Sequence, residues 1–420
     1  MTRDRLLLYV AAFTRSTAVG MSGVLVALYL AEQGFGAGVV GAVVSAGLLG
    51  GAAGTLLVSL AAERIGRRAT LFSVTLVSVA GTLLFSTSSS AWVLAGAAFI
   101  GMVNGMGRDR GAAFSIEQAL LPDTATESGR TQAFAWYNVV LDSGHALGAL
   151  AAVTPVLLRH ALGLQMLVSY RISFAVVAGL TLVGAAAYAG LSAGVIGAPA
   201  GAKGVQLAPE SKRRIAGLAG LFALDSVGGG FLTGALVSYW FFRRFGVGEE
   251  VLAPLFLAAR IANGASHLAA AWLARRIGLL NTMIFTHLPS SLFLLTVPIA
   301  PTFAVAAVLF LLRECLVEMD VPTRQSYVVA VVRPEERVAA SGATNLVRTL
   351  GWGVGPLFAG AAMQSLALWT PLVIGASLKI AYDGLLYGGF RKVKPPEERT
   401  AEDVAPRRTE PADAGAGDAV

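Results

Sequence analysis

The chain alternates between long apolar stretches and short polar breaks. Each apolar stretch holds roughly 20 or more residues, the length that an α-helix needs to cross the ~30 Å hydrocarbon core of a bilayer. Breaks such as the serine- and threonine-rich segment at 86–90 separate many of these stretches. The pattern predicts twelve transmembrane helices, at approximately 6–30, 38–60, 69–88, 92–119, 132–157, 171–191, 215–241, 250–273, 280–299, 302–331, 338–361 and 367–389.

The composition favours an all-α membrane protein. Hydrophobic residues make up 55% of the 420 residues and charged residues only 14%, whereas soluble domains carry about 25% charged residues. The 49 glycines fit the same class, because glycine is frequent in membrane helices and at their contacts. Basic cytoplasmic loops explain the net charge of +7, so we expect no nucleic-acid partner. The single cysteine, Cys315, excludes an internal disulfide.

The two halves of the chain resemble each other in sequence. The first span contains RSTAVG from Arg15, and the seventh contains DSVGGG from Asp225. Further matches follow in the same order along both halves at a nearly constant offset. Such a repeat predicts two pseudo-symmetric six-helix bundles. The expected division is a first bundle at 1–191, a cytoplasmic linker at 192–214, a second bundle at 215–390 and a disordered cytoplasmic tail at 391–420.

Basic residues predict how the helices are oriented, because Lys and Arg are enriched in the cytoplasmic loops of membrane proteins. One set of helix ends carries Arg3, Arg5, Arg64, Arg67, Arg68, Arg130, Lys203, Lys212, Arg213, Arg214, Arg275, Arg276, Arg333, Arg337, Arg391 and Lys392. The opposite ends carry only Arg159, Arg171, Arg243 and Arg244. We therefore expect a multi-pass protein of the inner (cytoplasmic) membrane with both termini in the cytoplasm.

The loop between the second and third predicted spans carries a family motif. It reads SLAAERIGRR, against the family pattern Gly-x-x-x-Asp-Arg-x-Gly-Arg-Arg. Arg64, Gly66, Arg67 and Arg68 match the pattern, whereas Ser59 replaces the first Gly and Glu63 replaces the Asp. With the spans and the repeat, this loop resembles the major facilitator superfamily of secondary transporters over roughly residues 6–390. The resemblance implies alternating access and a cavity lined by the first, fourth, seventh and tenth helices. It also implies that the loop is a gate that steadies the outward-open state.

Glycine motifs leave the subfamily open. Drug:proton antiporters of the superfamily carry Gly-x-x-x-Gly-Pro in the fifth helix. Here the fifth span has Gly144 and Gly148 without the proline, whereas the eleventh span has Gly351, Gly355 and Pro356. Both glycine pairs are also typical of close helix packing. We expect a bacterial efflux-type member whose subfamily is unassigned.

The tenth predicted span carries an unusual density of charge. RECLVEMDVPTRQ, at 313–325, lies between apolar flanks that are each too short to cross the membrane. Charges inside a bilayer cost roughly +2.5 to +3.5 kcal/mol each on insertion scales, so these side chains face the bundle interior or a wet cavity. On a continuous helix, Arg313, Asp320 and Arg324 share one face. Glu314 and Glu318 form a neighbouring stripe.

Polar residues also lie inside other predicted spans. The fourth contains Arg108, Asp109, Arg110 and Glu117, the fifth Asn138, Asp142 and His145, and the eighth Arg260, Asn263 and His267. Arg15 of the first span and Asp225 of the seventh are opposite charges at equivalent positions of the repeat, which favours a pair between the halves. Interior arginines and carboxylates balance in number, which predicts a self-paired network without surplus positive charge.

These residues favour transport over catalysis. Metal-ligand spacings, nucleotide-binding loops and hydrolase motifs are absent from the sequence, so we expect no enzyme activity, metal or cofactor. The candidates for the substrate and proton pathway are Arg15, Arg108, Asp109, Arg110, Asp142, His145, Asp225, Glu314, Glu318, Asp320 and Arg324. The first expectation is proton-coupled export of a small polar or charged organic solute by a monomer. The alternatives are proton-coupled import of an organic anion, or a non-transporting receptor on the same fold.

Overall fold

A computed structural model describes residues 2–109, 111–125, 130–192, 209–330, 332–333 and 336–391. Every regular element within these ranges is a helix. Eight helical segments among them are long and apolar enough to cross a membrane. Large apolar side chains such as Leu57, Trp92 and Leu268 are exposed along the helices, which is the surface that lipid would cover. The chain is therefore a multi-pass helical membrane protein.

The helices follow the predicted apolar stretches closely. The first half forms α1 (Arg3–Glu32), α2 (Ala37–Arg64), α3 (Arg67–Thr87), α4 (Ala91–Gly101), α5 (Ala112–Leu120), the 3-10 helix η1 (Leu121–Thr124), α6 (Arg130–Ala151), α7 (Thr154–Leu162) and α8 (Met166–Ala189). The second half forms α9 (Pro209–Gly230), α10 (Gly234–Phe245), α11 (Glu249–Ile277), α12 (Leu279–Thr296), the 3-10 helix η3 (Val297–Ile299), α13 (Phe303–Val317), α14 (Asp320–Ala330), α15 (Arg337–Ser365) and α16 (Thr370–Phe390).

One boundary differs from the prediction. Helix α9 begins at Pro209, so the last part of the expected linker at 192–214 is helical. Residues 193–208 of that linker and residues 392–420 of the expected tail lie outside the described residues.

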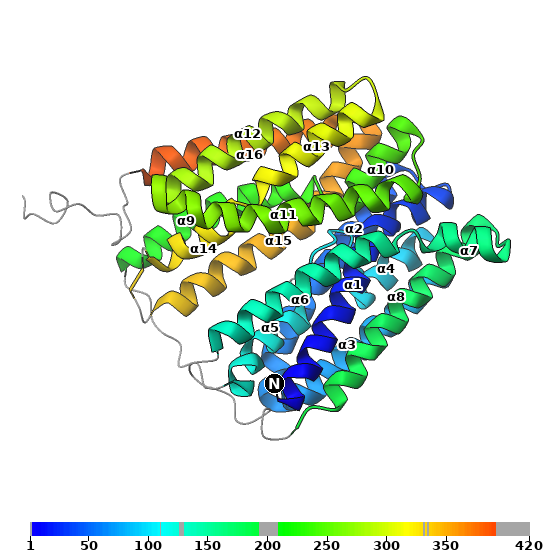
Figure 1. Cartoon of the computed structure of the whole chain (residues 1–420), viewed down its shortest axis with the longest axis horizontal. Coiled ribbons are helices and arrows are strands. Elements are labelled where there is room, and N and C mark those ends of the chain that lie inside the picture. The colour runs from blue at the N-terminus through cyan, green and yellow to red at the C-terminus, as the bar shows by residue number, and fades with distance from the viewer. Residues whose placement is uncertain are drawn as a thin grey trace, which may run out of the picture.

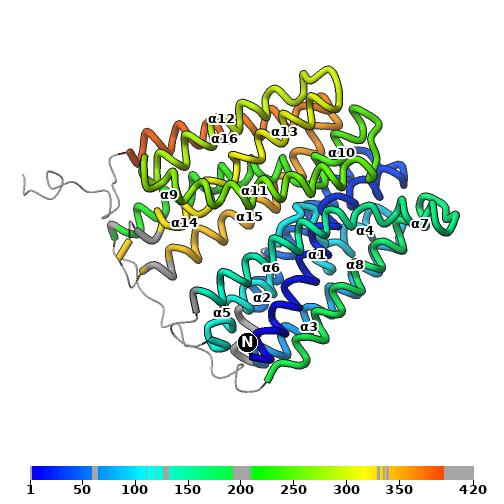
Figure 2. Tube along the Cα trace, viewed as in Figure 1, coloured from blue at the N-terminus to red at the C-terminus, as the bar shows by residue number. Residues whose placement is uncertain are grey.

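The expected continuous fourth helix is wrong, because residues 102–109 and 111, between α4 and α5, are not helical (Figure 2). Met102 has a left-handed backbone with φ of 50°, and Gly107 has φ of 75°. The amide of Asn104 replaces helical hydrogen bonds with local ones: its Nδ2 donates to the Arg108 carbonyl at 2.7 Å, and its Oδ1 accepts from the Met106 N–H at 2.8 Å. Arg108 and Asp109 therefore lie on a loop rather than on a helix face.

The seventh and tenth predicted helices are also divided. Gly228–Gly230 end α9, and Thr233 caps α10 by accepting a hydrogen bond from the Leu236 N–H. In the tenth span, α13 ends at Val317 and α14 begins at Asp320. Pro322 has no N–H to donate to the carbonyl four residues earlier, which belongs to Glu318. This division places Glu318 at a helix break.

The helices form two groups, one from each half of the chain (Figure 1). In the first group α1 packs on α6 and α8, and α3 packs on α4 and α8. In the second group α9 packs on α15 and α16, and α12 packs on α13 and α16. Contacts between the groups run from α2 to α15, from α1 to α10 and from α6 to α11.

The hydrophobic core is shared between the halves at one end only. One cluster joins residues of both halves, including Leu25 and Tyr29 of α1 with Trp240 and Phe241 of α10. At the end that holds the N-terminus there are two separate clusters. One contains only first-half residues such as Leu8, and the other contains only second-half residues. The halves are therefore joined by apolar packing at the end away from the N-terminus, and they have separate cores at the N-terminal end.

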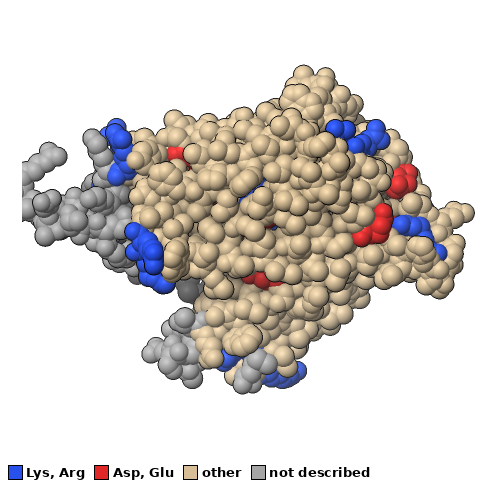
Figure 3. All heavy atoms as spheres, turned by 45° about the horizontal axis from the view of Figure 1, so that its top comes forward, with Lys and Arg blue, Asp and Glu red and all other residues tan. Residues whose placement is uncertain are grey.

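Charged side chains gather near the two ends of the visible face, and its broad middle is almost free of them (Figure 3). This distribution matches a lipid-facing belt between two aqueous ends.

The repeat also appears in the backbone. Gly66 and Gly278 are aligned by the sequence repeat, precede α3 and α12, and have φ values of 87° and 85°. Glycine adopts this left-handed region at little steric cost.

Candidate functional site

Two adjoining cavities lie where the helix breaks meet. The first contains about 1000 Å³ of space and the second about 870 Å³, open solvent included. Residues of α1, α2, α3 and α8 and the α4–α5 break line the first cavity, and residues of α9–α11 and α13–α16 line most of the second. Met106, Arg108 and Trp352 line both. We treat the two cavities as one candidate site with two compartments.

The breaks themselves touch across the halves. The N–H of Ala235, at the start of α10, donates to the Gly105 carbonyl at 2.9 Å. Gly234 stands against Gly23 of α1 and Met106, where an added Cβ would lie 3.0 Å from the Gly23 carbonyl oxygen. Glycine is needed at this position because the backbones approach so closely.

Arg15 organises a buried charged cluster in the first half. Its guanidinium forms an ion pair with Asp109 and binds both carboxylate oxygens of Glu117, at 2.7 and 2.6 Å. The hydroxyls of Tyr137 and Tyr188 donate to the same Glu117 carboxylate. Glu117 is fully buried, and these donors satisfy its charge, which is the condition for holding a carboxylate away from water.

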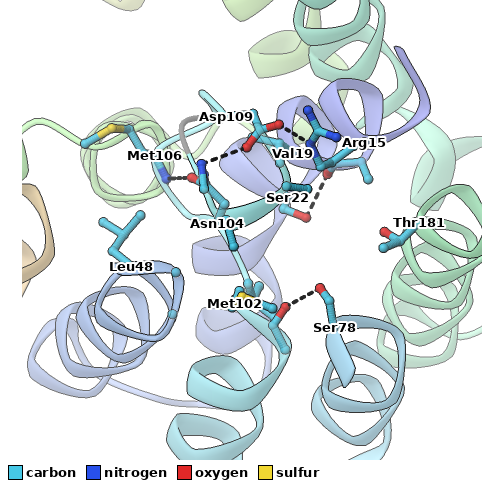
Figure 4. A pocket seen from close by; sticks show the side chains of 18 of the residues that line it. Arg15, Val19, Ser22, Leu48, Ser78, Met102, Asn104, Met106, Asp109 and Thr181 are labelled. Carbon is cyan, nitrogen blue, oxygen red and sulfur yellow. Dashed lines mark hydrogen bonds and ion pairs between the residues drawn. The ribbon is translucent and has the colours of Figure 1, made fainter. Parts of the chain in front are cut away.

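Figure 4 shows Arg15 and Asp109 facing each other at the edge of the first cavity. His145 supports this corner from α6, because its Nε2 accepts a hydrogen bond from the Asp109 N–H at 2.9 Å. Around the cavity, Ser22, Ser78 and Thr181 donate their hydroxyls to backbone carbonyls at 2.8, 2.6 and 2.9 Å. Each hydroxyl oxygen keeps lone pairs that can accept hydrogen bonds.

Asp225 organises a second buried cluster with the opposite polarity. Its carboxylate binds Arg324 of α14 at 3.1 Å and Lys379 of α16 at 2.7 Å. Arg324 also binds Asp320 at 2.7 Å. Asp225, Arg324 and Lys379 are at most 6% exposed and line the second cavity.

His287 of α12 extends this cluster. Its Nδ1 lies 2.9 Å from an oxygen of Asp383, and its Nε2 lies 3.2 Å from the Lys379 ammonium. Because the ammonium is a donor, Nε2 accepts in the neutral ring and Nδ1–H donates to Asp383. His287 therefore joins the cavity-lining Lys379 to Asp383, which lies behind it. We name Asp225, His287, Arg324, Lys379 and Asp383 the Asp225 cluster.

Arg108 connects the two halves at the centre of the site. From the α4–α5 break it forms an ion pair with Glu318, at the α13–α14 break. It also donates to the side-chain oxygen of Asn263 on α11, whose Nδ2 donates to Glu314 at 2.7 Å. Arg313 forms an ion pair with the same Glu314. Two broken helices, one from each half, therefore bring their charges together.

A second connection between the halves lies at the end where the core is shared. Glu249, the first residue of α11, is 3% exposed. Its carboxylate forms an ion pair with Arg159 of α7 at 2.6 Å and accepts a hydrogen bond from the Tyr170 hydroxyl of α8 at 2.9 Å. We name these three residues the Glu249 latch.

The predicted gating loop contacts its own half. Gly66 forms the turn before α3, Arg67 lies 3.9 Å from Asp123, and Arg68 donates to the Ala189 carbonyl. The side chains of Glu63 and Arg64 lie outside the described residues. The contact between α2 and α15 lies towards the opposite end of α2, where Ser45 donates to the Gly353 carbonyl.

The structure brings together most of the predicted pathway residues, but not all. Arg15, Asp109 and His145 meet in the first half, and the remaining described candidates line the second cavity, except Asp142. Asp142 is exposed on α6, and Arg110 lies outside the described residues. The hypothesis of an Arg15–Asp225 pair is wrong for this structure, because each residue is paired within its own half.

Sequence reasoning missed Lys379, Asp383, His287 and Glu249. Lys379 and Asp383 are four residues apart in the last apolar stretch, and this intramembrane pair is the same signal that identified the tenth span. Glu249 lies just outside a predicted span, where a charge is ordinary, so the pattern gave no signal for it.

Comparison with known proteins identifies the family. Residues 8–356 match the Major Facilitator Superfamily. The chain belongs to this superfamily. An uncharacterised membrane protein of Saccharomyces cerevisiae is 25% identical over 418 residues, covering 92% of this chain and 93% of the yeast protein.

Solved transporters of the superfamily share the fold. The nucleoside transporter NupG superposes with a TM-score of 0.71 at 13% identity, covering 93% of this chain and 100% of that one. A D-xylose–proton symporter superposes with a TM-score of 0.69 at 14% identity, covering 91% and 96%. At these identities the likeness shows the fold alone. Family and fold indicate a transporter rather than an enzyme.

Proposed function

We propose that this superfamily member is a secondary active transporter that moves a small polar or charged organic solute by alternating access. Its proposed architecture is twelve transmembrane helices in two six-helix bundles, at 1–191 and 215–390. The observation that carries the proposal is the asymmetric core. Apolar packing joins the halves at one end, separate cores remain at the other, and a charged two-compartment cavity lies between. Such an arrangement can open at either end by rocking the halves about a central site.

The orientation is part of the proposal. The Lys- and Arg-rich helix ends lie in the cytoplasm of the inner-membrane topology expected from the sequence, with both termini on that side. The separate cores then face the cytoplasm, so the described conformation is inward-facing. In the outward-open state, the gating loop with Glu63, Arg64, Arg67 and Arg68 would meet the second half and steady that state.

The Asp225 cluster is the proposed proton site. His287 lines the cavity and contacts both Lys379 and Asp383. A histidine is the side chain whose charge most readily changes between pH 5 and 8. A proton on Nε2 would remove the acceptor that Lys379 uses. It would also place a third cation, besides Arg324 and Lys379, near Asp225, whose carboxylate lies 3.7 Å from that nitrogen. The ion pairs of Asp225 would then rearrange, which would couple protonation to the relative positions of the helices α9, α14 and α16.

Transport is tested with the purified protein in liposomes. A thermal-shift screen selects solutes that bind, and vesicles preloaded with a selected solute are then given its radiolabelled form. The proposal predicts counterflow by the wild-type protein that a Cys pair locking the Glu249 latch abolishes. Solute binding without counterflow under any gradient would favour the receptor alternative.

The direction of transport is tested by the sign of a pH gradient. Export in exchange for protons, the first expectation, predicts solute accumulation in vesicles that are acidic inside. Import together with protons predicts accumulation in vesicles that are acidic outside. A monomer is proposed as the working unit, because both cavities lie within one chain, and light scattering in detergent measures its mass.

A further inference from the structure

The second cavity holds more positive than negative side chains, which the balanced charges of the sequence did not predict. Its lining includes the cations Arg108, Arg260, Arg313, Arg324, Arg348 and Lys379, and the carboxylates Asp225, Glu314, Glu318 and Asp320. Counting Asp383 behind His287, the cations still outnumber the carboxylates. The cavity differs from the charge balance expected from the sequence for two reasons. Asp109 and Glu117 are bound by Arg15 in the first half, and the sequence prediction did not include Lys379.

The surplus is located at Arg260. Arg108 is paired with Glu318, Arg313 with Glu314, and both Arg324 and Lys379 with Asp225. The Arg348 guanidinium stacks over the Trp352 ring, 4.5 Å from its centroid. Within the ranges that the structure describes, Arg260 forms neither a hydrogen bond nor an ion pair within 4.0 Å. Asp142 of α6 is solvent-exposed and lines neither cavity.

The guanidinium of Arg260 is held at the junction of the two compartments. It lies against Gly107 in the α4–α5 break, where an added Cβ would stand 3.0 Å from one of its nitrogens. Met106, beside Gly107, lines both compartments, as does Arg108. A half-buried guanidinium that contacts no carboxylate directly is electrostatically costly, and a bound anion would offset that cost. Guanidinium also matches carboxylate and phosphate groups in a bidentate geometry.

We propose that the solute is an organic anion whose acid group, a carboxylate or a phosphate, binds Arg260 and Arg108. Its uncharged body lies in the first compartment. That compartment offers the hydroxyl oxygens of Ser22, Ser78 and Thr181 among apolar side chains. Because these hydroxyls already donate to the backbone, they serve as acceptors, which suits a body carrying hydroxyl or N–H groups. This inference rests on the proposed transport function, and it names the chemical class of the solute.

The first test uses solutes matched in size but different in charge. One set is gluconate, sorbitol and glucamine, and the other is benzoate, benzyl alcohol and benzylamine. Binding to the purified protein is measured by thermal shift and calorimetry at neutral pH. We expect the anions to bind and the neutral and cationic members to bind at least about tenfold more weakly. Arg260→Gln is expected to remove that preference and Arg260→Lys to keep part of it. The exposed Arg243→Gln, on α10 outside both cavities, is the control and leaves binding unchanged.

The second test measures the charge of the cavity without any solute. In a Cys315→Ser background, Met106→Cys is labelled with the anionic sulfonatoethyl and the cationic trimethylammonioethyl methanethiosulfonates. The inference predicts faster labelling by the anionic reagent, by about tenfold relative to a free thiol, and loss of this ratio on Arg260→Gln. Equal labelling, or faster labelling by the cation, overturns the inference, and this holds even if none of the six solutes binds.

The outcomes separate the two proposals. Counterflow of sorbitol or glucamine without counterflow of the anions would retain transport and overturn the anion site. Anion binding that depends on Arg260, without counterflow in vesicles, would retain the site and overturn transport.

Discussion

The two halves hold their buried charges with opposite polarity. In the first half, the cation Arg15 on α1 holds two carboxylates, Asp109 and Glu117. In the second half, the anion Asp225 on α9 occupies the equivalent place and holds two cations, Arg324 and Lys379. A sequence repeat preserves the geometry of the helices, whereas the sign of the charge is free to invert as long as each cluster is paired internally.

The two clusters also differ in what surrounds them. Both oxygens of Glu117 are bound by Arg15 and by two tyrosine hydroxyls, and its side chain is fully buried. Within the part of the chain that the structure describes, the ring of His145 in that cluster binds a backbone N–H alone. In the second half His287 stands between two charged side chains and lines a cavity. From this difference we propose that the first cluster stabilises the fold and that the second is the proton site of the proposed function.

The largest effect is expected from removing the cation of the first cluster. Arg15→Ala leaves two buried carboxylates without a cation, and breaking a buried pair in this way costs about 3–5 kcal/mol. The variant should lose thermal stability and yield, measured by fluorescence-detected size-exclusion chromatography after heating. A well-folded Arg15→Ala protein with impaired transport would assign the functional role to the first half instead.

A smaller effect, limited to the coupling of transport to protons, is expected from a change in the second cluster. His287→Gln should reduce proton-driven accumulation at least about tenfold and leave counterflow intact, because solute binding does not need the proton. The matched control is His145→Gln, a histidine of the first cluster, which should keep the wild-type dependence on pH. If both variants respond alike to pH, the distinction between the clusters fails.

Almost no coupling free energy is expected between Arg15 and Asp225, the central residues of the two clusters. The double change Arg15→Asp with Asp225→Arg would restore folding only if the two side chains touched, and here each is paired within its own half. The thermal stabilities of both single variants and of the double variant form a double-mutant cycle, and the coupling energy should lie within about 0.5 kcal/mol of zero. A coupling above that would indicate a direct contact in another conformation.

The sequence predicted the apolar stretches well, because a membrane span leaves a long and continuous signal. It did not predict the breaks around Asn104 and Glu318, because local hydrogen bonds and one proline interrupt spans that apolar residues flank on both sides. Charged partners depend on these breaks. The prediction assigned the Arg108 side chain to a helix face from its position in a continuous helix. The loop instead directs this side chain towards Glu318 of the other half. Equivalent positions in the repeat suggested an Arg15–Asp225 pair, but periodicity carries no information on which half supplies a partner.

The most direct test of alternating access follows both ends of the molecule at once. Two spin-label pairs are placed in a Cys315→Ser background: Leu162 with Arg243 near the Glu249 latch, and Gln132 with Arg275 near the N-terminal end. All four positions are exposed. Glu249→Gln weakens the ion pair that closes the latch. Double electron–electron resonance should then show that the Leu162–Arg243 distance lengthens and the Gln132–Arg275 distance shortens in the same population. Unchanged distances, or two distances that move in the same direction, would contradict alternating access.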